Sequence, residues 1–189
     1  MGGALFKHRG WIPVPLLGLG LIYCQAVGPL TALGLSLIPL GLLIRLWGML
    51  HIGPGARNRK ITVQKLVYTG PYELSRNPLY IANIIMYCGV GLGVGGLLGF
   101  VVALLASAIH YSLIVRFEEA ELERRLGEVY RSYINRVPRW LGESAPVHAA
   151  APKGEMEDRL NRALLAERST YVVSVVVICV VTLRAFTVG

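Results

Sequence analysis

Two long stretches without a charged residue dominate the pattern of this chain. The first runs from Trp11 to Ile44 and the second from Ile81 to Val115. An α-helix rises about 1.5 Å per residue and the bilayer core is about 30 Å thick, so roughly 20 residues cross it. Each stretch is therefore long enough for two short spans. Backbone groups in lipid must be hydrogen-bonded internally, so the pattern predicts membrane-spanning helices.

Turn-forming residues interrupt both stretches near their middles. Gly28-Pro29 divides the first stretch. The second is crowded with glycines, namely Gly89, Gly91, Gly93, Gly95, Gly96 and Gly99. Glycine and proline are the strongest local signals for a turn. The sequence thus predicts four helices, near residues 11–27, 30–51, 79–94 and 98–117.

A shorter apolar run from Ser169 to Leu183 predicts a fifth span near 169–187, provided that Arg184 extends its charge to the headgroup layer. A helix lying on the membrane surface is the alternative. The expected fold is an all-α integral membrane protein with about five transmembrane helices, in a single domain over residues 1–189. Residues 52–78 and 118–168 are expected to form a cytoplasmic connector and amphipathic helices.

Positive charge predicts the orientation of these helices. The chain has 19 Lys and Arg residues against 11 Asp and Glu, a net charge of +8. Most basic residues precede the first predicted span or lie in the two long polar segments. Cytoplasmic loops carry the excess of Lys and Arg, so we expect the N-terminus and these segments inside the cell. Anionic lipid headgroups explain the charge, and no nucleic-acid partner is expected.

The second uncharged stretch is predicted to be a hairpin, so both of its ends emerge on the same side of the membrane. The segment before it reads Gly70-Pro71-Tyr72-Glu73-Leu74-Ser75-Arg76-Asn77-Pro78-Leu79-Tyr80. The segment after it begins Arg116-Phe117-Glu118-Glu119. We therefore expect these two polar segments to meet in space and to form a site between them.

Arg76, Glu118 and Glu119 are the residues best suited to chemistry at this site. The planar guanidinium of Arg76 fits a carboxylate or a phosphate. Carboxylates at headgroup depth are costly unless they are paired or hydrated. The two glutamates are expected to hold a cationic ligand group, or else to pair with arginines on a solvated helix face. Asn77 and Pro78 suit the N-cap and first position of the third helix, with or without a ligand.

Other apparent motifs are assigned to packing. Gly91-Leu92-Gly93-Val94-Gly95-Gly96 fits a dinucleotide-binding pattern, but it lies inside the hydrophobic hairpin, without the strand and polar surface that such a site needs. His51 and His110 have no second ligand at helical spacing, so no metal is expected. The three cysteines fall inside predicted spans and have no metal spacing.

The two polar segments resemble those of a known family. The order GPY-x-x-x-R-[HN]-P-x-Y, an apolar hairpin, then EE-x-x-L-x-x-x-x-G-x-x-Y-x-x-Y-x-x-x-VPR is similar to the isoprenylcysteine carboxyl methyltransferase and phospholipid methyltransferase superfamily. Here the second part reads Glu118-Glu119, Leu122, Gly127, Tyr130, Tyr133 and Val137-Pro138-Arg139. The resemblance covers about residues 66–140 and implies an integral membrane enzyme that uses S-adenosylmethionine.

The resemblance also implies roles for individual residues. Cofactor contacts are expected from Arg76, Asn77, Pro78, Tyr80, Glu118 and Glu119. The catalytic residues would be Arg76, Glu118 and Glu119. Tyr130, Tyr133 and Arg136 would shape the pocket or hold the substrate headgroup. The expected reaction is transfer of a methyl group to a lipid or lipid-linked acceptor.

Asn77 departs from one branch of the family, because prenylcysteine enzymes have His at that position. Asn does not titrate near neutral pH, so no proton-transfer role is expected there. A carboxylate or phosphate acceptor needs no base and is preferred. A phospholipid amine needs one, and Glu118 or Glu119 is then the candidate. The alternatives are an NADPH-dependent protein similar to sterol reductases, and a non-catalytic membrane scaffold that keeps the fold.

Overall fold

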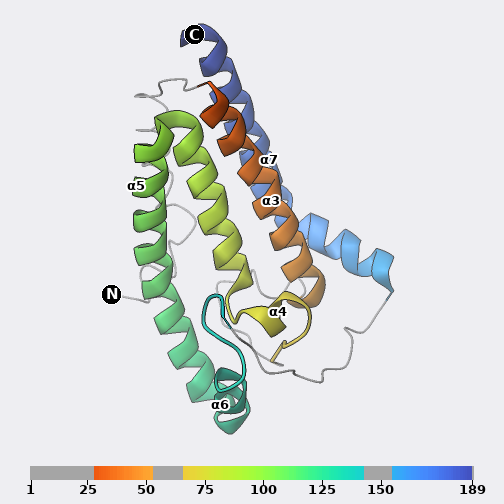
Figure 1. Cartoon of the computed structure of the whole chain (residues 1–189). Helices are drawn as coiled ribbons and strands as arrows, with labels where there is room; N and C mark the ends of the chain where they lie inside the picture. Colours follow the sequence, from red (N-terminus) through yellow and green to blue (C-terminus); the bar gives the residue numbers. More distant parts are fainter. Residues whose placement is uncertain (1–27, 53–65, 143–154, 189) are drawn as a thin grey trace.

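The computed structural model describes residues 28–52, 66–142 and 155–188, and every regular element in these ranges is helical (Figure 1). The elements are α3 (Pro29–Ile52), α4 (Pro71–Leu74), α5 (Pro78–Leu126), α6 (Glu128–Ile134) and α7 (Met156–Val188). The predicted all-α class is confirmed. The helix predicted at 11–27 lies outside the described residues.

Three of these helices, α3, α5 and α7, are long and apolar enough to cross a membrane. α5 consists of two legs, because its backbone is not helical at Gly95 and Gly96. Gly96 has φ 56°, a conformation that glycine adopts without steric strain. The legs run back along each other (Figure 1), and the backbones of Gly91 and Gly99 meet across the turn. The break falls between the two helices predicted for this stretch.

Glycines allow α3 to pack closely against the first leg of α5. A methyl group placed on Gly89 would lie 2.6 Å from the carbonyl oxygen of Gly34 and 2.9 Å from Cβ of Leu37. Small residues at such contacts are typical of helix pairs in membranes. Where α7 joins these two helices, a core cluster forms from Ile38, Val94, Val177 and Val181. The bundle is therefore held by close backbone contact at one seam and by branched side chains at the other.

Large apolar side chains cover the outside of the second leg of α5. Leu98 is 75% exposed and Ile109 is 63% exposed. An apolar surface of this kind on a bundle indicates contact with another apolar phase. Together with the three apolar helices, it identifies a membrane protein.

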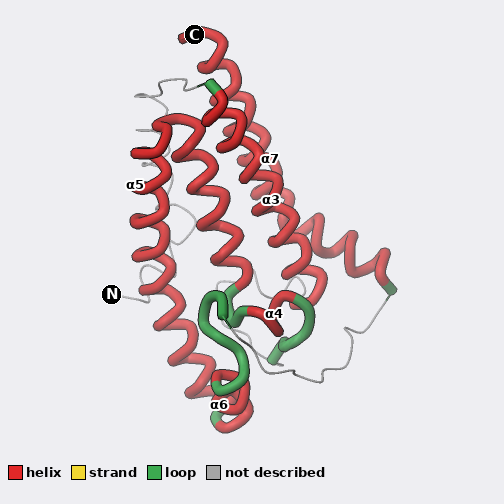
Figure 2. Tube along the Cα trace, in the orientation of Figure 1, coloured by secondary structure: helices red, strands yellow, loops and turns green. Residues whose placement is uncertain are grey.

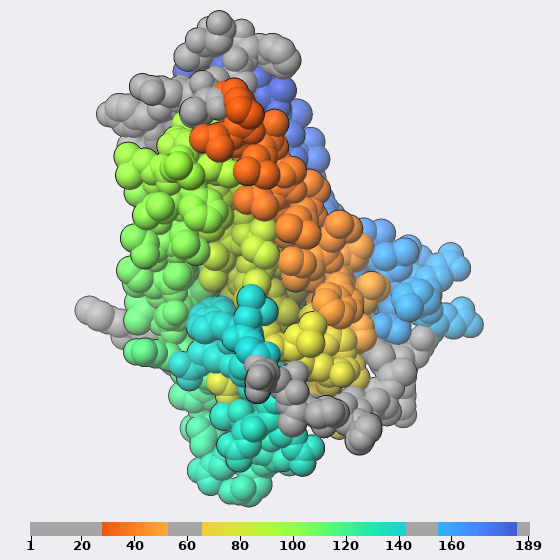
Figure 3. Space-filling model, viewed as in Figure 1, coloured from red at the N-terminus to blue at the C-terminus, as the bar shows by residue number. Residues whose placement is uncertain are grey.

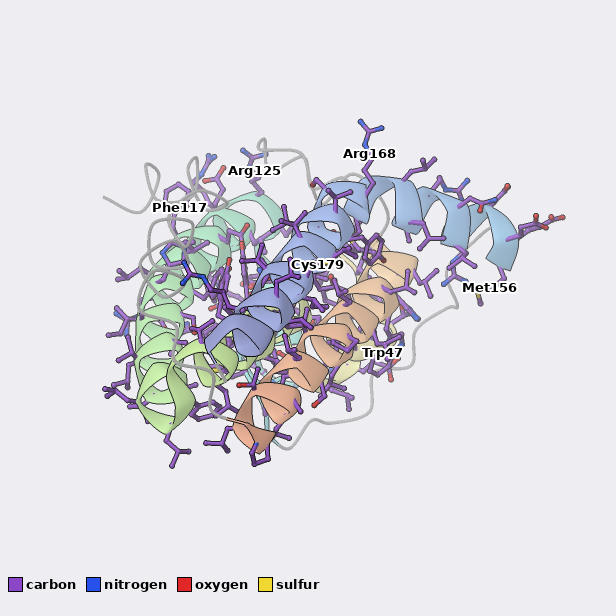
Figure 4. All side chains as sticks on the ribbon, turned by 90° about the horizontal axis from the view of Figure 1, so that it is seen from above. Trp47, Phe117, Arg125, Met156, Arg168 and Cys179 are labelled. Atoms are coloured by element: carbon purple, nitrogen blue, oxygen red, sulfur yellow. The ribbon has the colours of Figure 1, made fainter. Side chains whose placement is uncertain are left out.

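α7 is one continuous helix, whereas the sequence suggests a separate charged segment ahead of a span at 169–187. The first turns of α7 project away from the bundle, with Met156 at the far end (Figures 1 and 4). The Arg159 guanidinium donates two hydrogen bonds, of 3.0 and 2.8 Å, to the carbonyl oxygen of Leu50. These bonds satisfy a carbonyl in the last turn of α3 and tie the two helices together.

The loops that the structure describes gather at one end of the bundle (Figure 2). α5 runs on to Leu126, and Gly127, with φ 53°, separates it from α6. The first part of the helical region expected within 118–168 is therefore a continuation of α5, and Gly127 separates it from α6. Residues 135–142 then turn back and lie against the α4 region (Figure 3).

Candidate functional site

The two polar segments that the hairpin was predicted to bring together do meet, and hydrogen bonds to the backbone join them. The Arg76 N–H donates to the carbonyl oxygen of Pro138 at 3.0 Å. The carbonyl oxygen of Arg139 accepts from Ser75 Oγ at 3.3 Å and from Asn77 Nδ2 at 3.1 Å. Hydrogen bonds at Ser75, Arg76 and Asn77 therefore hold the loop ahead of α5. They fix the position of the Arg76 backbone, from which its side chain extends.

Glu119 lies at the centre of this junction, 7% exposed. Its Oε2 accepts from Arg139 Nε at 2.9 Å and lies 2.7 Å from Nη2 of the same residue. Its Oε1 accepts from Asn77 Nδ2 at 3.3 Å. Both carboxylate oxygens are thus engaged by groups of the protein itself. Both Arg139 nitrogens converge on the one oxygen, and hydrogen bonds between charged groups of this kind are stronger than those between neutral groups.

The Arg76 side chain is only 8% exposed, and part of its guanidinium is unsatisfied. Nε lies 3.3 Å from Glu119 Oε1, which is an ion-pair distance. Its N–H is not directed at that oxygen, however, and neither Nε nor Nη1 has a hydrogen-bond partner among the described residues. Buried charged donors normally find partners, so an unsatisfied guanidinium indicates a place for an anionic group.

Glu118 faces a different neighbour. The Tyr80 hydroxyl donates to Glu118 Oε2 at 2.7 Å, joining the start of one leg of α5 to the end of the other. The Tyr80 ring also packs on Tyr111, with ring centroids 4.9 Å apart. Glu118 is half-buried, whereas Glu119 is buried. The adjacent carboxylates therefore have distinct surroundings.

Of the three residues proposed to hold the substrate, two pack together in the interior and the third lies on the surface. Tyr130 and Tyr133 form a buried cluster with Val137, and the Tyr133 hydroxyl donates to the carbonyl oxygen of Tyr72 at 2.7 Å. Burial raises the pKa of both tyrosines above the usual value, so they stay neutral in the folded protein. Arg136 is exposed. Both tyrosines lie close enough to Glu119 and Arg76 for these charges to act on them.

Two contributors to this junction were not assigned from the sequence. Arg139 supplies the main counter-charge of Glu119 as well as the carbonyl oxygen that receives Ser75 and Asn77. Its position in the Val137-Pro138-Arg139 run was the available signal. No sequence pattern marked Ser75, because its hydroxyl bonds backbone groups. Its Oγ accepts from the Asn77 N–H at 3.0 Å.

The assembled site offers a buried guanidinium with free donors, a carboxylate held by a tyrosine, and a second carboxylate enclosed by arginines. It lies at the end of the apolar bundle, where the described loops gather (Figure 2). Such a site can bind a ligand that carries both an anionic and a cationic group. The apolar faces beside it can receive the chain of a lipid.

Comparison with known proteins identifies the family of the chain. Two curated bacterial relatives are similar to the chain. The cobalt-zinc-cadmium resistance protein CzcN of Cupriavidus metallidurans is 34% identical over 142 residues, which is 73% of this chain and 56% of that protein. The nickel-cobalt-cadmium resistance protein NccN of Alcaligenes xylosoxydans xylosoxydans is 32% identical over 128 residues, 68% of this chain and 50% of that protein.

The chain thus spans about half the length of the curated relatives it matches. No solved structure matches it. A family model does match, over residues 29–129, which contain α3, α4 and α5 with Arg76, Glu118 and Glu119. The chain belongs to the phospholipid methyltransferase family.

Proposed function

We propose that this protein transfers a methyl group from S-adenosylmethionine to a lipid or lipid-linked acceptor at the membrane surface. The observation that carries the proposal is the Arg76 guanidinium, buried and with two nitrogens lacking hydrogen-bond partners among the described residues. Family membership supports methyl transfer in general. The nature of the methyl donor and of the acceptor is inferred from the charges of the site.

The charged groups of the methyl donor fit the residues present. Arg76 would hold its carboxylate through the unsatisfied N–H groups. Glu118 would hold its ammonium group or its ribose hydroxyls, and Tyr80 keeps that carboxylate oriented. Asn77 is the N-cap of α5 and Pro78 is its first residue, so both follow Arg76 directly and would lie beside the bound donor. When bound, the cofactor supplies an electrophilic methyl group.

Glu119 has a different part in this proposal. Because Arg139 and Asn77 occupy its oxygens, it fixes the loop and the Arg76 guanidinium rather than presenting a free carboxylate. We still count it among the residues of the cofactor site, as the group that positions Arg76. Direct methyl transfer depends on alignment and on exclusion of water, so fixed positions in this loop contribute to the rate.

The acceptor is proposed to carry a carboxylate or a phosphate. Arg139 is 40% exposed and lies beside the enclosed carboxylate, so it can face an anionic headgroup arriving from the membrane. A phospholipid amine would require removal of a proton, and Glu118 is then the available base. The exposed Arg136 is proposed to contact the headgroup, and the buried Tyr130 and Tyr133 to shape the pocket. By the positive-inside rule, we propose that this end of the bundle faces the cytoplasm.

The names of the two relatives concern resistance to metals, and an anionic acceptor provides a physical link. Methylation of a lipid carboxylate or phosphate removes a negative charge from the membrane surface, and that charge attracts divalent cations. Cells that express the wild-type protein should then tolerate more cadmium than cells that express Glu118→Gln. Equal tolerance in cells whose lipids are demonstrably methylated would break the link.

The test of the proposed function uses the purified full chain in detergent or nanodiscs. S-adenosylhomocysteine should raise its unfolding temperature, whereas NADPH should not, because a ligand stabilises only the state that binds it. Incubation with labelled S-adenosylmethionine and total membrane lipid should label a lipid. Stabilisation by NADPH instead would favour a reductase, and stabilisation by neither ligand, with no labelled lipid, would favour a scaffold.

A further inference from the structure

A second buried polar cluster lies outside the candidate site. Arg45 of α3 donates from Nε to Glu167 Oε2 at 2.9 Å and from Nη2 to Glu167 Oε1 at 2.8 Å. The two side chains are 12% and 1% exposed. Arg45 Nη1 also donates to Oδ1 of Asn83 on α5. One guanidinium thus joins α3, α5 and α7.

Stability alone does not account for this cluster. A buried ion pair loses hydration, and apolar residues of similar volume often stabilise a protein equally well or better. The seam of α3 against α5 already packs through glycines, and apolar side chains join α7 to both. The buried Arg45 guanidinium is therefore expected to have a role besides stability, and its contact with Asn83 indicates what that role is.

The contacts of Asn83 lead from Arg45 to the candidate site. Asn83 follows Tyr80 by three residues, so the two side chains lie on one face of the same leg of α5, and Asn83 also lies close to the Tyr111 side chain. The Tyr111 ring is 2% exposed and packs on Tyr80 at 4.9 Å. The Tyr80 hydroxyl in turn donates to Glu118. These contacts form a path from Arg45 through Asn83, Tyr111 and Tyr80 to the Glu118 carboxylate.

A tyrosine on the other side of this path is also near both ends. Tyr72 is 6% exposed, and its hydroxyl has no hydrogen-bond partner among the described residues. It lies close enough to Arg45, Glu118 and Glu167 for their charges to act on it. Tyr72 is therefore within electrostatic reach of both ends of the path.

We propose that Arg45 is a positioning residue for the candidate site: through Asn83 and Tyr111 it fixes Tyr80 and hence the orientation of Glu118. Glu167 makes this dependent on α7, because it holds the Arg45 fork in place. The proposal rests on the proposed function in one respect, namely that Glu118 contacts the methyl donor. Arg45 itself does not touch the donor.

The test uses variants that remove the path without leaving a buried charge alone. The double variant Arg45→Met with Glu167→Met removes both charges, and Asn83→Leu interrupts the path while the ion pair remains. Each should bind S-adenosylhomocysteine about tenfold more weakly than the wild type, the size expected for contacting residues of one network. Combined with Tyr80→Phe, the losses should not add, because all of these changes act on the same carboxylate.

Thr31→Val is the matched control. Thr31 Oγ1 donates to the carbonyl oxygen of Gly93 at 3.2 Å, so this change also removes a buried hydrogen bond between α3 and α5, but at the other end of α3. It should lower the unfolding temperature and leave the ligand affinity unchanged. Arg45→Lys keeps a charge for Glu167 but lacks the fork, so it should retain the unfolding temperature and still lose affinity.

A second readout separates this proposal from the proposed function. With 3-fluorotyrosine at position 80, the fluorine NMR signal reports the ring environment without any ligand. The signal should shift or broaden in Asn83→Leu and in the double variant, but not in Thr31→Val. An unchanged signal in the first two would overturn the positioning role. Failure of the wild type to bind S-adenosylhomocysteine, with the signal responding as expected, would overturn the proposed function and not the coupling.

Discussion

Glutamine substitutions at Glu118 and Glu119 should have opposite consequences, although the two residues are adjacent. Glu119→Gln removes the charge between Arg76 and Arg139, and Glu118→Gln removes a charge that a tyrosine hydroxyl holds. We expect the first variant to lose stability. The second should keep its stability and lose affinity for S-adenosylhomocysteine.

The magnitude follows from the burial of each partner. Removing one member of a buried ion pair costs about 3–5 kcal/mol, because the remaining charge is left without compensation. Arg76 is 8% exposed and bears this cost, whereas Arg139 is 40% exposed and regains hydration. We therefore expect about 2–3 kcal/mol for Glu119→Gln, after discounting the exposed partner. For a chain of this size that is a fall of about 4–12 °C in unfolding temperature.

The Glu118 variant retains most of its local interaction. An amide oxygen still accepts from the Tyr80 hydroxyl, so the loss of stability should stay within about 1 kcal/mol. Its effect should appear in a calorimetric titration with S-adenosylhomocysteine, where affinity falls by about tenfold or more when a charge-assisted bond is lost. Glu128→Gln is the control: Glu128 is 86% exposed and pairs only with an exposed arginine, so neither quantity should change.

Thermal unfolding in one detergent, followed by intrinsic fluorescence, measures the first effect in all three variants. Equal losses of unfolding temperature in the Glu118 and Glu119 variants would refute the division of roles. So would a Glu119 variant that unfolds with the wild type, because Arg76 would then have another counter-charge.

Two further predictions concern packing and pH. Gly89→Ala should destabilise the protein by about 1–3 kcal/mol, because the added methyl group meets a backbone carbonyl oxygen at 2.6 Å. The methyl group of Gly93→Ala meets nothing closer than 3.6 Å, so this variant should be neutral or stabilising. Thermal unfolding of both variants checks the difference. The raised pKa of Tyr130 and Tyr133 predicts stability that is full below the ordinary tyrosine pKa of about 10 and falls as pH rises above it, since the unfolded chain ionises first. Unfolding measured from pH 8 upward should show a smaller alkaline loss in Tyr133→Phe than in the wild type, and an equal loss would contradict the burial argument.

Much of the helical framework was predictable, because lipid leaves the backbone few choices. The uncharged run from Ile81 to Val115 requires helices, and a run of that length requires a turn within it. The glycines marked where the turn would be, and the break occurs at Gly95 and Gly96. The meeting of Arg76 with Glu119 then followed from topology alone, because a hairpin returns its ends to one side.

The pairing of charges between separate helices was not predictable from local pattern. Arg45 ends an apolar run and Glu167 lies in a charged segment, so each has an ordinary local explanation. Only the packing of α7 against α3 brings them within 2.8 Å. The contacts of Arg139 were likewise not predictable from local pattern, because its carbonyl oxygen joins the site as well as its side chain. A backbone acceptor has no signature in the residue type.

The division between Glu118 and Glu119 is a consequence of helix geometry. Successive residues on an α-helix point about 100° apart, so adjacent carboxylates cannot face one ligand group equally. In this chain one direction leads to Tyr80 and the other to Asn77 and Arg139. The sequence presents the two glutamates as a single motif with one joint role. Because the second leg of α5 stays helical past both residues to Leu126, the two carboxylates face different partners. Glu119 holds the loop that places Arg76, and Glu118 is the one that we propose to contact the ligand.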